Sequence, residues 1–284
     1  MSLIDQIEAA SVPSGSVGIW FLGQASVVLR TERWTIYIDP YLSDFVEHVT
    51  RARGQPVVRR YPSLVDPAAV RNADLVLVTH DHEDHLDLDT LPIVAGASPR
   101  ARFVLPGRSA RILAETGIAR ERILVPPADE TIAPLPGLTL AAIPAAHEEL
   151  EQEPGLGHRF FGYVLDAQGV RVYHSGDTLV YPGLLELLQR HRVAVGLVVI
   201  NGRDSVRRQR GIVGNMTYRE AADLADAAGF DLTIPLHYDL FERNGERPGK
   251  FVDDLYERHP HRTVLVLGRG AGVVYTPQKP ARKS

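Results

Sequence analysis

Residues 78–87 read VTHDHEDHLD and place three histidines and four acidic residues in ten positions, directly after an apolar run. That run, ADLVLVTH, predicts a buried strand that ends on His80. From this end, His80 and His82 can point to one position, while Asp84 and His85 can face a second position nearby. Imidazole nitrogen and carboxylate oxygen suit zinc, manganese or iron. The pattern therefore predicts a metal site, and a solvated acidic helix start is the alternative.

Three more strand candidates end on residues that can complete such a site. His147 ends LTLAAIPAAH, Asp177 ends VRVYHSGD, and His237 ends FDLTIPLH. One histidine at a strand end is more often a hydrogen-bonded structural residue, but four strand ends with metal-ligand side chains indicate a shared sheet edge. His174 lies within a strand candidate, offset from Asp177, and is expected to be structural or to support a ligand. The remaining histidines lack the strand-end context, and surface or core roles are expected for His48, His158, His191, His259 and His261.

The order of the predicted elements indicates two sheets. SVGIWFL, ASVVLR and WTIYIDP, within residues 16–40, are typical of an antiparallel meander. Strand and helix candidates then alternate, and the helix at residues 217–229 begins with a capping-box pattern. Residues 44–66 are polar and contain several arginines, which predicts a long loop or lid. Two stacked mixed sheets covered by helices would bury these strands, in one domain of residues 1–284.

Composition excludes several classes of protein. With no cysteine, the chain has no disulfide, no zinc–thiolate site and no cysteine nucleophile. The net charge of -4 gives no general attraction to nucleic acid or to an anionic membrane. Asp5 and Glu8 interrupt the N-terminus where a signal peptide needs an apolar core, and no apolar run is long enough to cross a bilayer. A cytoplasmic protein is therefore expected.

The ordered motifs resemble the metallo-β-lactamase superfamily, in which H-x-H-x-D-H is followed by a later His, an Asp and a last His. Within it, WFLGQASVVLRT, THDHEDHLD, YHSGDT, GNMTYREAADLA and IPLHYDLF are similar to the L-ascorbate-6-phosphate lactonase family. The resemblance covers nearly the whole chain, residues 18–275. It implies an α/β fold, the four-layer αββα sandwich of two mixed β-sheets, with the active site along one edge.

The resemblance also implies two divalent cations, manganese or zinc, with iron compatible as well. The implied ligands form two groups and a bridge: His80, His82 and His147, then Asp84, His85 and His237, with Asp177 between them. The chain departs from the lactonase family at His147, where that family has an acidic residue, and in a shorter segment before the histidine motif. This departure favours a fuller two-ion set and leaves the substrate open. Asp39 resembles an early aspartate that supports a ligating histidine, although a simple turn is the alternative.

Metal chemistry then predicts the reaction. Two cations sharing one water lower its pKa towards about 7, and the resulting hydroxide attacks a carbonyl carbon or a phosphorus. The second ion stabilises the oxyanion that develops. Asp84 is the predicted catalytic residue, orienting the hydroxide or taking its proton. Its alternative is a ligand with no part in proton transfer.

An arginine-rich loop is the candidate for substrate recognition. INGRDSVRRQRGIVGNMTY, residues 200–218, follows a predicted buried strand and precedes a capped helix. Guanidinium groups and helix-start amides both suit phosphate or carboxylate. Arg203 and Asn215 are the predicted substrate-binding residues, because they lie nearest the strand end and the helix start. Tyr238 is a further candidate. An exposed basic loop at a subunit contact, and a packed core tyrosine, are the alternatives.

These features predict a metal-dependent hydrolase, most simply a lactonase acting on a phosphorylated or carboxylated sugar lactone. A phosphodiesterase and a non-catalytic metal-binding protein are the alternatives. A redox enzyme is disfavoured, because the diiron relatives place glutamate where this chain has His82. The expected partner is a small anionic molecule, with no nucleic acid and no membrane, and a homo-oligomer is compatible with the sequence.

Overall fold

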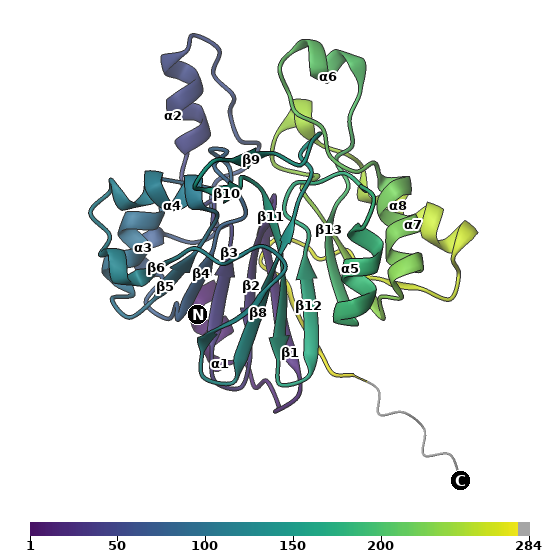
Figure 1. The fold of residues 1–284 in the computed structure, drawn as a ribbon, viewed down its shortest axis with the longest axis horizontal. Coiled ribbons are helices and arrows are strands. Elements are labelled where there is room, and N and C mark those ends of the chain that lie inside the picture. The colour runs from purple at the N-terminus through teal and green to yellow at the C-terminus, as the bar shows by residue number, and fades with distance from the viewer. Residues whose placement is uncertain (278–284) are drawn as a thin grey trace.

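The computed structural model describes residues 1–277 and contains two large β-sheets that pack face to face (Figure 1). The first sheet is an antiparallel meander extended by parallel strands. The meander predicted within residues 16–40 is thus confirmed. In spatial order the strands are β16 (Gly272–Tyr275), β1 (Val17–Gly23), β2 (Ser26–Arg30), β3 (Thr35–Ile38), β4 (Leu75–Leu77), β5 (Arg102–Val104) and β6 (Ile123–Leu124).

The second sheet is also mixed, antiparallel on one side and parallel on the other. In spatial order its strands are β15 (Thr263–Val264), β14 (Leu232–Leu236), β13 (Val195–Val199), β12 (Val170–His174), β11 (Phe161–Ala167), β8 (Leu138–Pro144) and β7 (Thr131–Leu135). A small separate ribbon pairs β9 (Gln152–Glu153) with β10 (Gly157–His158).

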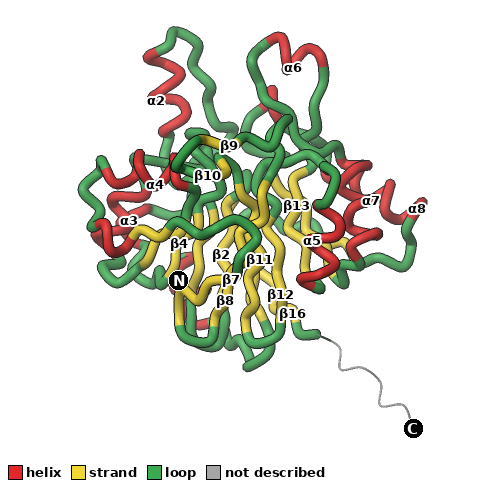
Figure 2. The backbone as a smooth tube through the Cα atoms, in the orientation of Figure 1, coloured by secondary structure: helices red, strands yellow, loops and turns green. Residues whose placement is uncertain are grey.

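Helices cover the outer face of each sheet, so the expected αββα architecture is confirmed (Figure 2). The first sheet is covered by α1 (Leu3–Ala9), α3 (Leu91–Ala97) and α4 (Gly107–Ala114). The second is covered by α5 (Leu184–His191), α7 (Tyr218–Ala228) and α8 (Pro248–Arg258). Short 3₁₀ helices are η1 (Pro67–Ala69), η2 (Arg120–Arg122) and η3 (Glu242–Asn244). Two further helices, α2 (Phe45–Ala52) and α6 (Ser205–Gln209), project from one edge of the sandwich (Figure 1).

Strand β1 shows how the sequence builds these layers. Side chains alternate between the two faces of a strand. Ile19 and Phe21 accordingly join the core between the sheets, whereas Trp20 and Leu22 join the core under the helices of the first sheet. All seven residues of β1 are buried. An almost uninterrupted apolar strand is therefore what a sheet covered on both faces requires.

The prediction of a loop for residues 44–66 is wrong for its first half, which forms α2. Two features stabilise this helix. Glu47 and Arg51 form an ion pair one turn apart. Val46 packs against Phe241 from a distant part of the chain, a contact that sequence spacing does not reveal. Residues 53–66, the remainder of the segment, contain no helix, so the prediction of a loop is confirmed for them. The short helix η1 begins just beyond this loop.

The predicted capped helix is confirmed as α7. The Thr217 hydroxyl accepts a hydrogen bond from the Glu220 amide, and the Glu220 carboxylate accepts one from the Thr217 amide. Gly229 ends the helix with a φ of 78°, a left-handed conformation that glycine adopts without strain. The cap fixes the point where α7 begins. The segment before it includes α6, which projects from the edge of the sandwich. Within residues 1–277, no helix has the length and apolar character needed to cross a bilayer.

Candidate metal centre

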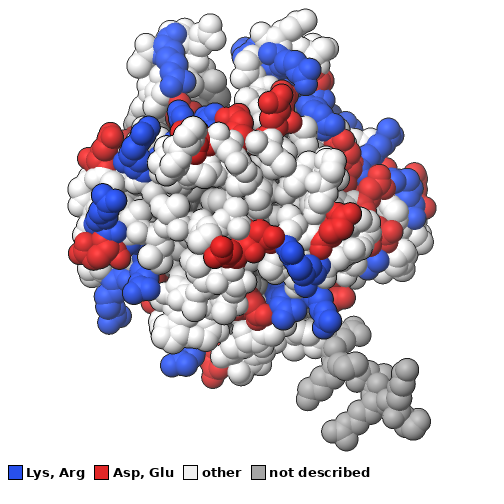
Figure 3. Space-filling model, in the orientation of Figure 1, with Lys and Arg blue, Asp and Glu red and all other residues white. Residues whose placement is uncertain are grey.

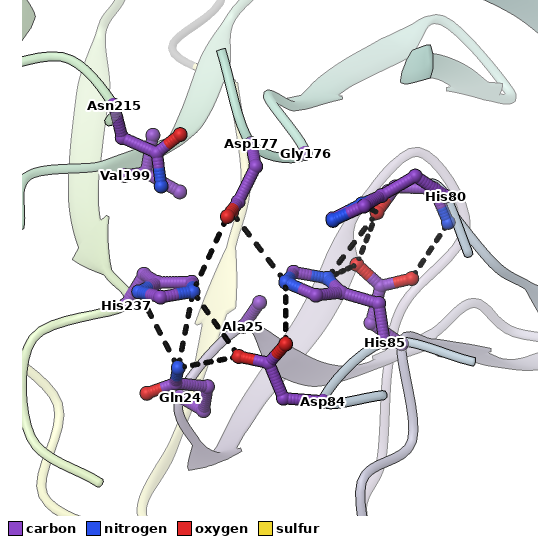
Figure 4. Close-up of polar contacts among 12 residues, drawn as sticks. Gln24, Ala25, His80, Asp84, His85, Gly176, Asp177, Val199, Asn215 and His237 are labelled. Carbon is purple, nitrogen blue, oxygen red and sulfur yellow. Dashed lines mark hydrogen bonds and ion pairs between the residues drawn. The ribbon is translucent and has the colours of Figure 1, made fainter. Parts of the chain in front are cut away.

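The polar residues singled out at strand ends lie in loops that follow the strands. Figure 4 shows how five of them come together: His80, Asp84, His85, Asp177 and His237. The loop after β4 carries the H-x-H-x-D-H motif, and His237 follows β14 directly. Asp177 follows a tight turn at Gly176, where φ is 55° and an added Cβ would lie 2.4 Å from the carbonyl oxygen of Phe161. Glycine at this position therefore lets the chain bring Asp177 into the cluster.

The structure brings together all seven side chains that the sequence proposes as ligands. Asp177 lies at the centre: its Oδ1 is 3.5 Å from His85 Nε2, and its Oδ2 is 3.4 Å from His237 Nε2 and 3.8 Å from His147 Nε2. Donor atoms lie within 4.8 Å of one another in groups that include both implied ligand sets: His80, His82 and His147, and Asp84, His85 and His237.

Hydrogen bonds fix the orientation of three of the rings. Asp39 accepts from His85 Nδ1 at 2.7 Å and also from the Thr79 hydroxyl at 2.7 Å. Because that hydroxyl donates to Asp39, it accepts from His80 Nδ1 at 3.0 Å. His147 Nδ1 donates to the Gly214 carbonyl at 3.2 Å. Each ring therefore carries its proton on Nδ1 and presents a free Nε2 to the cluster, the arrangement that outer partners impose on metal-ligating histidines.

The donor set fits divalent cations. Among residues 1–277, His80 Nε2, His85 Nε2 and Asp177 Oδ1 are buried and have no hydrogen-bond partner. Buried polar atoms without partners are costly, by about 1–3 kcal/mol each. A cation shared by imidazole nitrogens and carboxylate oxygens would satisfy them together. The cluster therefore indicates a divalent metal site.

The two halves of the cluster differ in protonation. Burial lowers the pKa of His80 and His82, and lowers the pKa of His147 to about 4. Burial acts in the same direction on His85 and His237, but the carboxylates of Asp177 and Asp84 outweigh it and raise the pKa of both rings. The first three histidines therefore favour the neutral form more strongly than an ordinary imidazole does, whereas His85 and His237 hold a second proton more tightly than an ordinary imidazole.

This difference predicts that the two groups lose cations at different pH. A raised pKa means that a cation must displace protons from His85 and His237, so its affinity there falls as pH drops through those pKa values. At the other group, proton competition begins only as the pH approaches the depressed pKa values, about 4 for His147. Metal content measured across pH should therefore fall in two steps. Calorimetry in buffers of different ionisation enthalpy should detect proton release mainly when an ion binds at the group of His85 and His237. One shared step would contradict the prediction.

Gln24 is a buried cluster residue that sequence reasoning misses. Its Nε2 donates to Asp84 Oδ2 at 2.8 Å. The same nitrogen is 3.0 Å from His237 Nε2 and 3.4 Å from His237 Nδ1, and such similar distances place it against the face of the ring (Figure 4). The Gln24 carbonyl accepts from the His237 amide at 2.7 Å. Its only sequence signal is a glutamine in a turn between two strongly apolar strands.

Replacing Gln24 should weaken the group that contains Asp84. Gln24→Met keeps the length of the side chain but removes the donor to Asp84 and the support of His237. Loss of such an outer partner lowers metal affinity by about 10–100-fold, which chelator competition would measure. Gln168→Met is a matched control, because Gln168 is exposed and has a φ of 57° beside the 56° of Gln24. Equal affinity in the two variants would show that Gln24 does not position the site.

The structure shows what each predicted substrate-binding residue contacts within the fold. Arg203 forms a two-pronged ion pair with Glu220, at 2.6 and 2.7 Å, and so holds the start of α7. Asn215 is fully buried, and its amide donates to Asn201 at 3.0 Å. The Tyr238 hydroxyl donates to the Leu267 carbonyl at 3.3 Å, and its ring stacks on Phe21. None of the three predicted residues lines the cleft above the cluster.

That cleft has a volume of about 1050 Å³ and is floored by His82, Asp84, His147, Asp177 and His237. Its walls are two projecting arms: the first arm is residues 45–58 and the second arm is residues 205–213. Figure 3 shows the notch between them. Arg210 and Arg243 line the cleft, and neither forms an ion pair within the described chain. Sequence reasoning includes Arg210 in the arginine-rich loop but misses Arg243, which follows no predicted strand end.

Fold and cluster together define a metallo-hydrolase built on the β-lactamase fold. The chain belongs to the β-lactamase superfamily, because the β-lactamase superfamily domain model matches residues 34–238. Similar proteins include the probable L-ascorbate-6-phosphate lactonases of Escherichia fergusonii and Salmonella heidelberg. Each is 26% identical over 267 residues, which cover 84% of this chain and 74% of the relative.

Solved structures confirm the fold. Igni18, a metallo hydrolase of Ignicoccus hospitalis, superposes with a TM-score of 0.67 at 20% identity, covering 93% of this chain and 100% of its own. An isothiocyanate hydrolase from Delia radicum gut bacteria superposes with a TM-score of 0.69 at 16% identity, covering 92% and 100%. At these identities the likeness concerns the fold alone.

Proposed function

We propose that this protein is a metal-dependent lactonase that hydrolyses a phosphorylated or carboxylated sugar lactone. The observation that carries the proposal is that the buried histidine and aspartate cluster opens into a cleft lined by Arg210 and Arg243, which form no ion pair among residues 1–277. Guanidinium groups bind phosphate and carboxylate through paired hydrogen bonds. The similarity to probable L-ascorbate-6-phosphate lactonases supports a cyclic ester as the reacting group.

The cluster residues have distinct roles in this proposal. Divalent cations, manganese or zinc, supply Lewis acidity and lower the pKa of water towards neutrality. Asp177 joins the two histidine groups. Asp84 is 16% exposed to the cleft, and its pKa is lowered because His85 and His237 outweigh the effect of burial. A carboxylate with a depressed pKa is a weak proton acceptor. This favours Asp84 as a ligand over Asp84 as the general base.

The test is acid release from sugar-phosphate lactones by protein stripped with chelator and reloaded with manganese or zinc. Metal-dependent release, absent from the stripped protein, is the expected result. Release from a phosphodiester but from no lactone would instead favour the phosphodiesterase. Bound metal with no turnover of either class would favour a non-catalytic metal-binding protein.

A further inference from the structure

The walls of the cleft carry apolar side chains in positions that the hydrolysis of a small sugar lactone does not use. Val57 and Val58 line it from the first arm, Ile212 and Val213 from the second arm, and Phe241 from the base. Val57 is 41% and Val58 is 56% exposed. These residues border the same cavity as Asp84 and Asp177, so a molecule that reaches the cluster meets apolar side chains on both arms, beside polar ones such as Gln55 and Gln209.

Apolar side chains in a cleft discriminate between substrates because they offer no hydrogen-bond partner to a substrate hydroxyl group. A hydroxyl group moved from water to an apolar surface without a hydrogen-bond partner costs free energy, whereas an apolar group placed there gains it. The cavity is also at the upper end of the range of about 300–1,000 Å³ typical of small-molecule sites. Volume and lining together favour an occupant with an apolar portion larger than a sugar ring.

The charges on the cleft add a second requirement. Glu83 lines the cleft but is paired with Arg53 at 3.0 Å. Glu242 also lines the cleft, so outside the metal cluster the two arginines, Arg210 and Arg243, exceed the one carboxylate that is not paired with an arginine by one positive charge. An anionic group on the substrate would complement that charge.

We propose that the substrate is amphiphilic, with its ester carbonyl at the cluster, an apolar segment between the two arms, and an anionic group near Arg210 and Arg243. This inference rests on the proposed lactonase function: it keeps the anionic lactone but makes an apolar segment, and not the hydroxyl groups of a sugar, the preferred substituent. The reaction remains hydrolysis: the oxygen of water bonds to the carbonyl carbon, the ring C–O bond breaks, and the ring oxygen leaves with a proton as the hydroxyl of a hydroxy acid.

The experiment compares lactones that share one ring and one anionic group but carry either hydroxyl substituents or alkyl chains of increasing length. With manganese-loaded protein, kcat/KM should rise with chain length, by up to about fourfold per buried methylene. Faster hydrolysis of the hydroxylated parent than of every alkyl compound would overturn the inference and leave the lactonase function standing.

Variants of the first arm test whether its apolar side chains cause the dependence of kcat/KM on chain length. Val57→Asp and Val58→Asp should flatten the dependence on chain length, so that kcat/KM of the alkyl compounds falls relative to kcat/KM of the hydroxylated parent in the same variant. Val206→Asp is the matched control, because Val206 is 53% exposed on α6 and does not line the cleft. The same loss in all three variants would contradict the assignment.

Two outcomes separate this inference from the proposed function. If no lactone is hydrolysed, the proposed function fails, and calorimetric binding of the same alkyl compounds to the wild type and to Val58→Asp still tests the amphiphilic site. If sedimentation shows a dimer that Val57→Asp and Val58→Asp dissociate, the apolar arms bind a second copy of the chain, and the inference is overturned.

Discussion

Asp177→Asn is expected to lower kcat/KM by at least about 100-fold and to reduce the number of bound cations. Even the loss of a residue that only supports a ligand costs about 10–100-fold in metal affinity or activity, and Asp177 itself lies at the centre of the cluster. It is 4% exposed, and its two oxygens lie 3.4–3.8 Å from the Nε2 atoms of His85, His147 and His237.

The effect arises from charge. His237 and His85 outweigh burial and hold the pKa of Asp177 well below its ordinary value, so the side chain is an anion among buried rings. Asparagine keeps the shape of the aspartate side chain but removes its negative charge, which would offset the positive charge of two bound cations. Metal content and turnover should therefore fall together. Asp166→Asn, which removes the same charge near the end of β11, away from the cluster, is the control and should leave both unchanged. Retention of full metal content by Asp177→Asn would contradict a bridging role.

The strand-end residues show what the sequence could predict. An apolar run that stops at a histidine or aspartate is a local signal, and parallel strands bring their carboxyl ends to one sheet edge. This is why Asp177 and His237, which follow the parallel strands β12 and β14 of the second sheet, could be grouped from the amino-acid sequence alone. The same local logic predicted α7, whose capping residues lie within its own sequence.

Features fixed by distant contacts could not be predicted in this way. Gln24 and Asp84 are 60 residues apart and meet only because the first sheet brings the β1–β2 turn to the metal loop. Arg203 lies nearest the strand end, but Glu220 competes for its guanidinium and turns it away from the cleft. Arg243 reaches the cleft from η3, just beyond the IPLHYDLF motif, where the sequence carries no further signal. Pairing partners, rather than sequence position, decide which charged side chains remain free.

The second large effect is expected from Asp39→Asn, which should weaken cation binding by about 10–100-fold without changing any residue that faces the cleft. Asp39 is fully buried and accepts three hydrogen bonds of 2.7 Å, from the Thr79 amide, the Thr79 hydroxyl and His85 Nδ1. An asparagine presents N–H groups to one of these donors. Its φ of 45° suits asparagine, which tolerates the left-handed region, so backbone strain does not explain the loss.

The mispaired donor has two consequences that can be separated. One buried N–H without an acceptor lowers the free energy of unfolding by about 1–3 kcal/mol, which denaturant titration of the stripped protein measures. Release of His85 Nδ1 frees the ring to rotate or change tautomer, so affinity should fall more at the group of Asp84, His85 and His237 than at the other group. Asp74→Asn is the control, because Asp74 also accepts a strand amide, that of Thr35 at 2.9 Å, but contacts no cluster residue. If Asp39→Asn and Asp74→Asn lower stability alike and bind cations alike, Asp39 supports the fold and does not orient the metal centre.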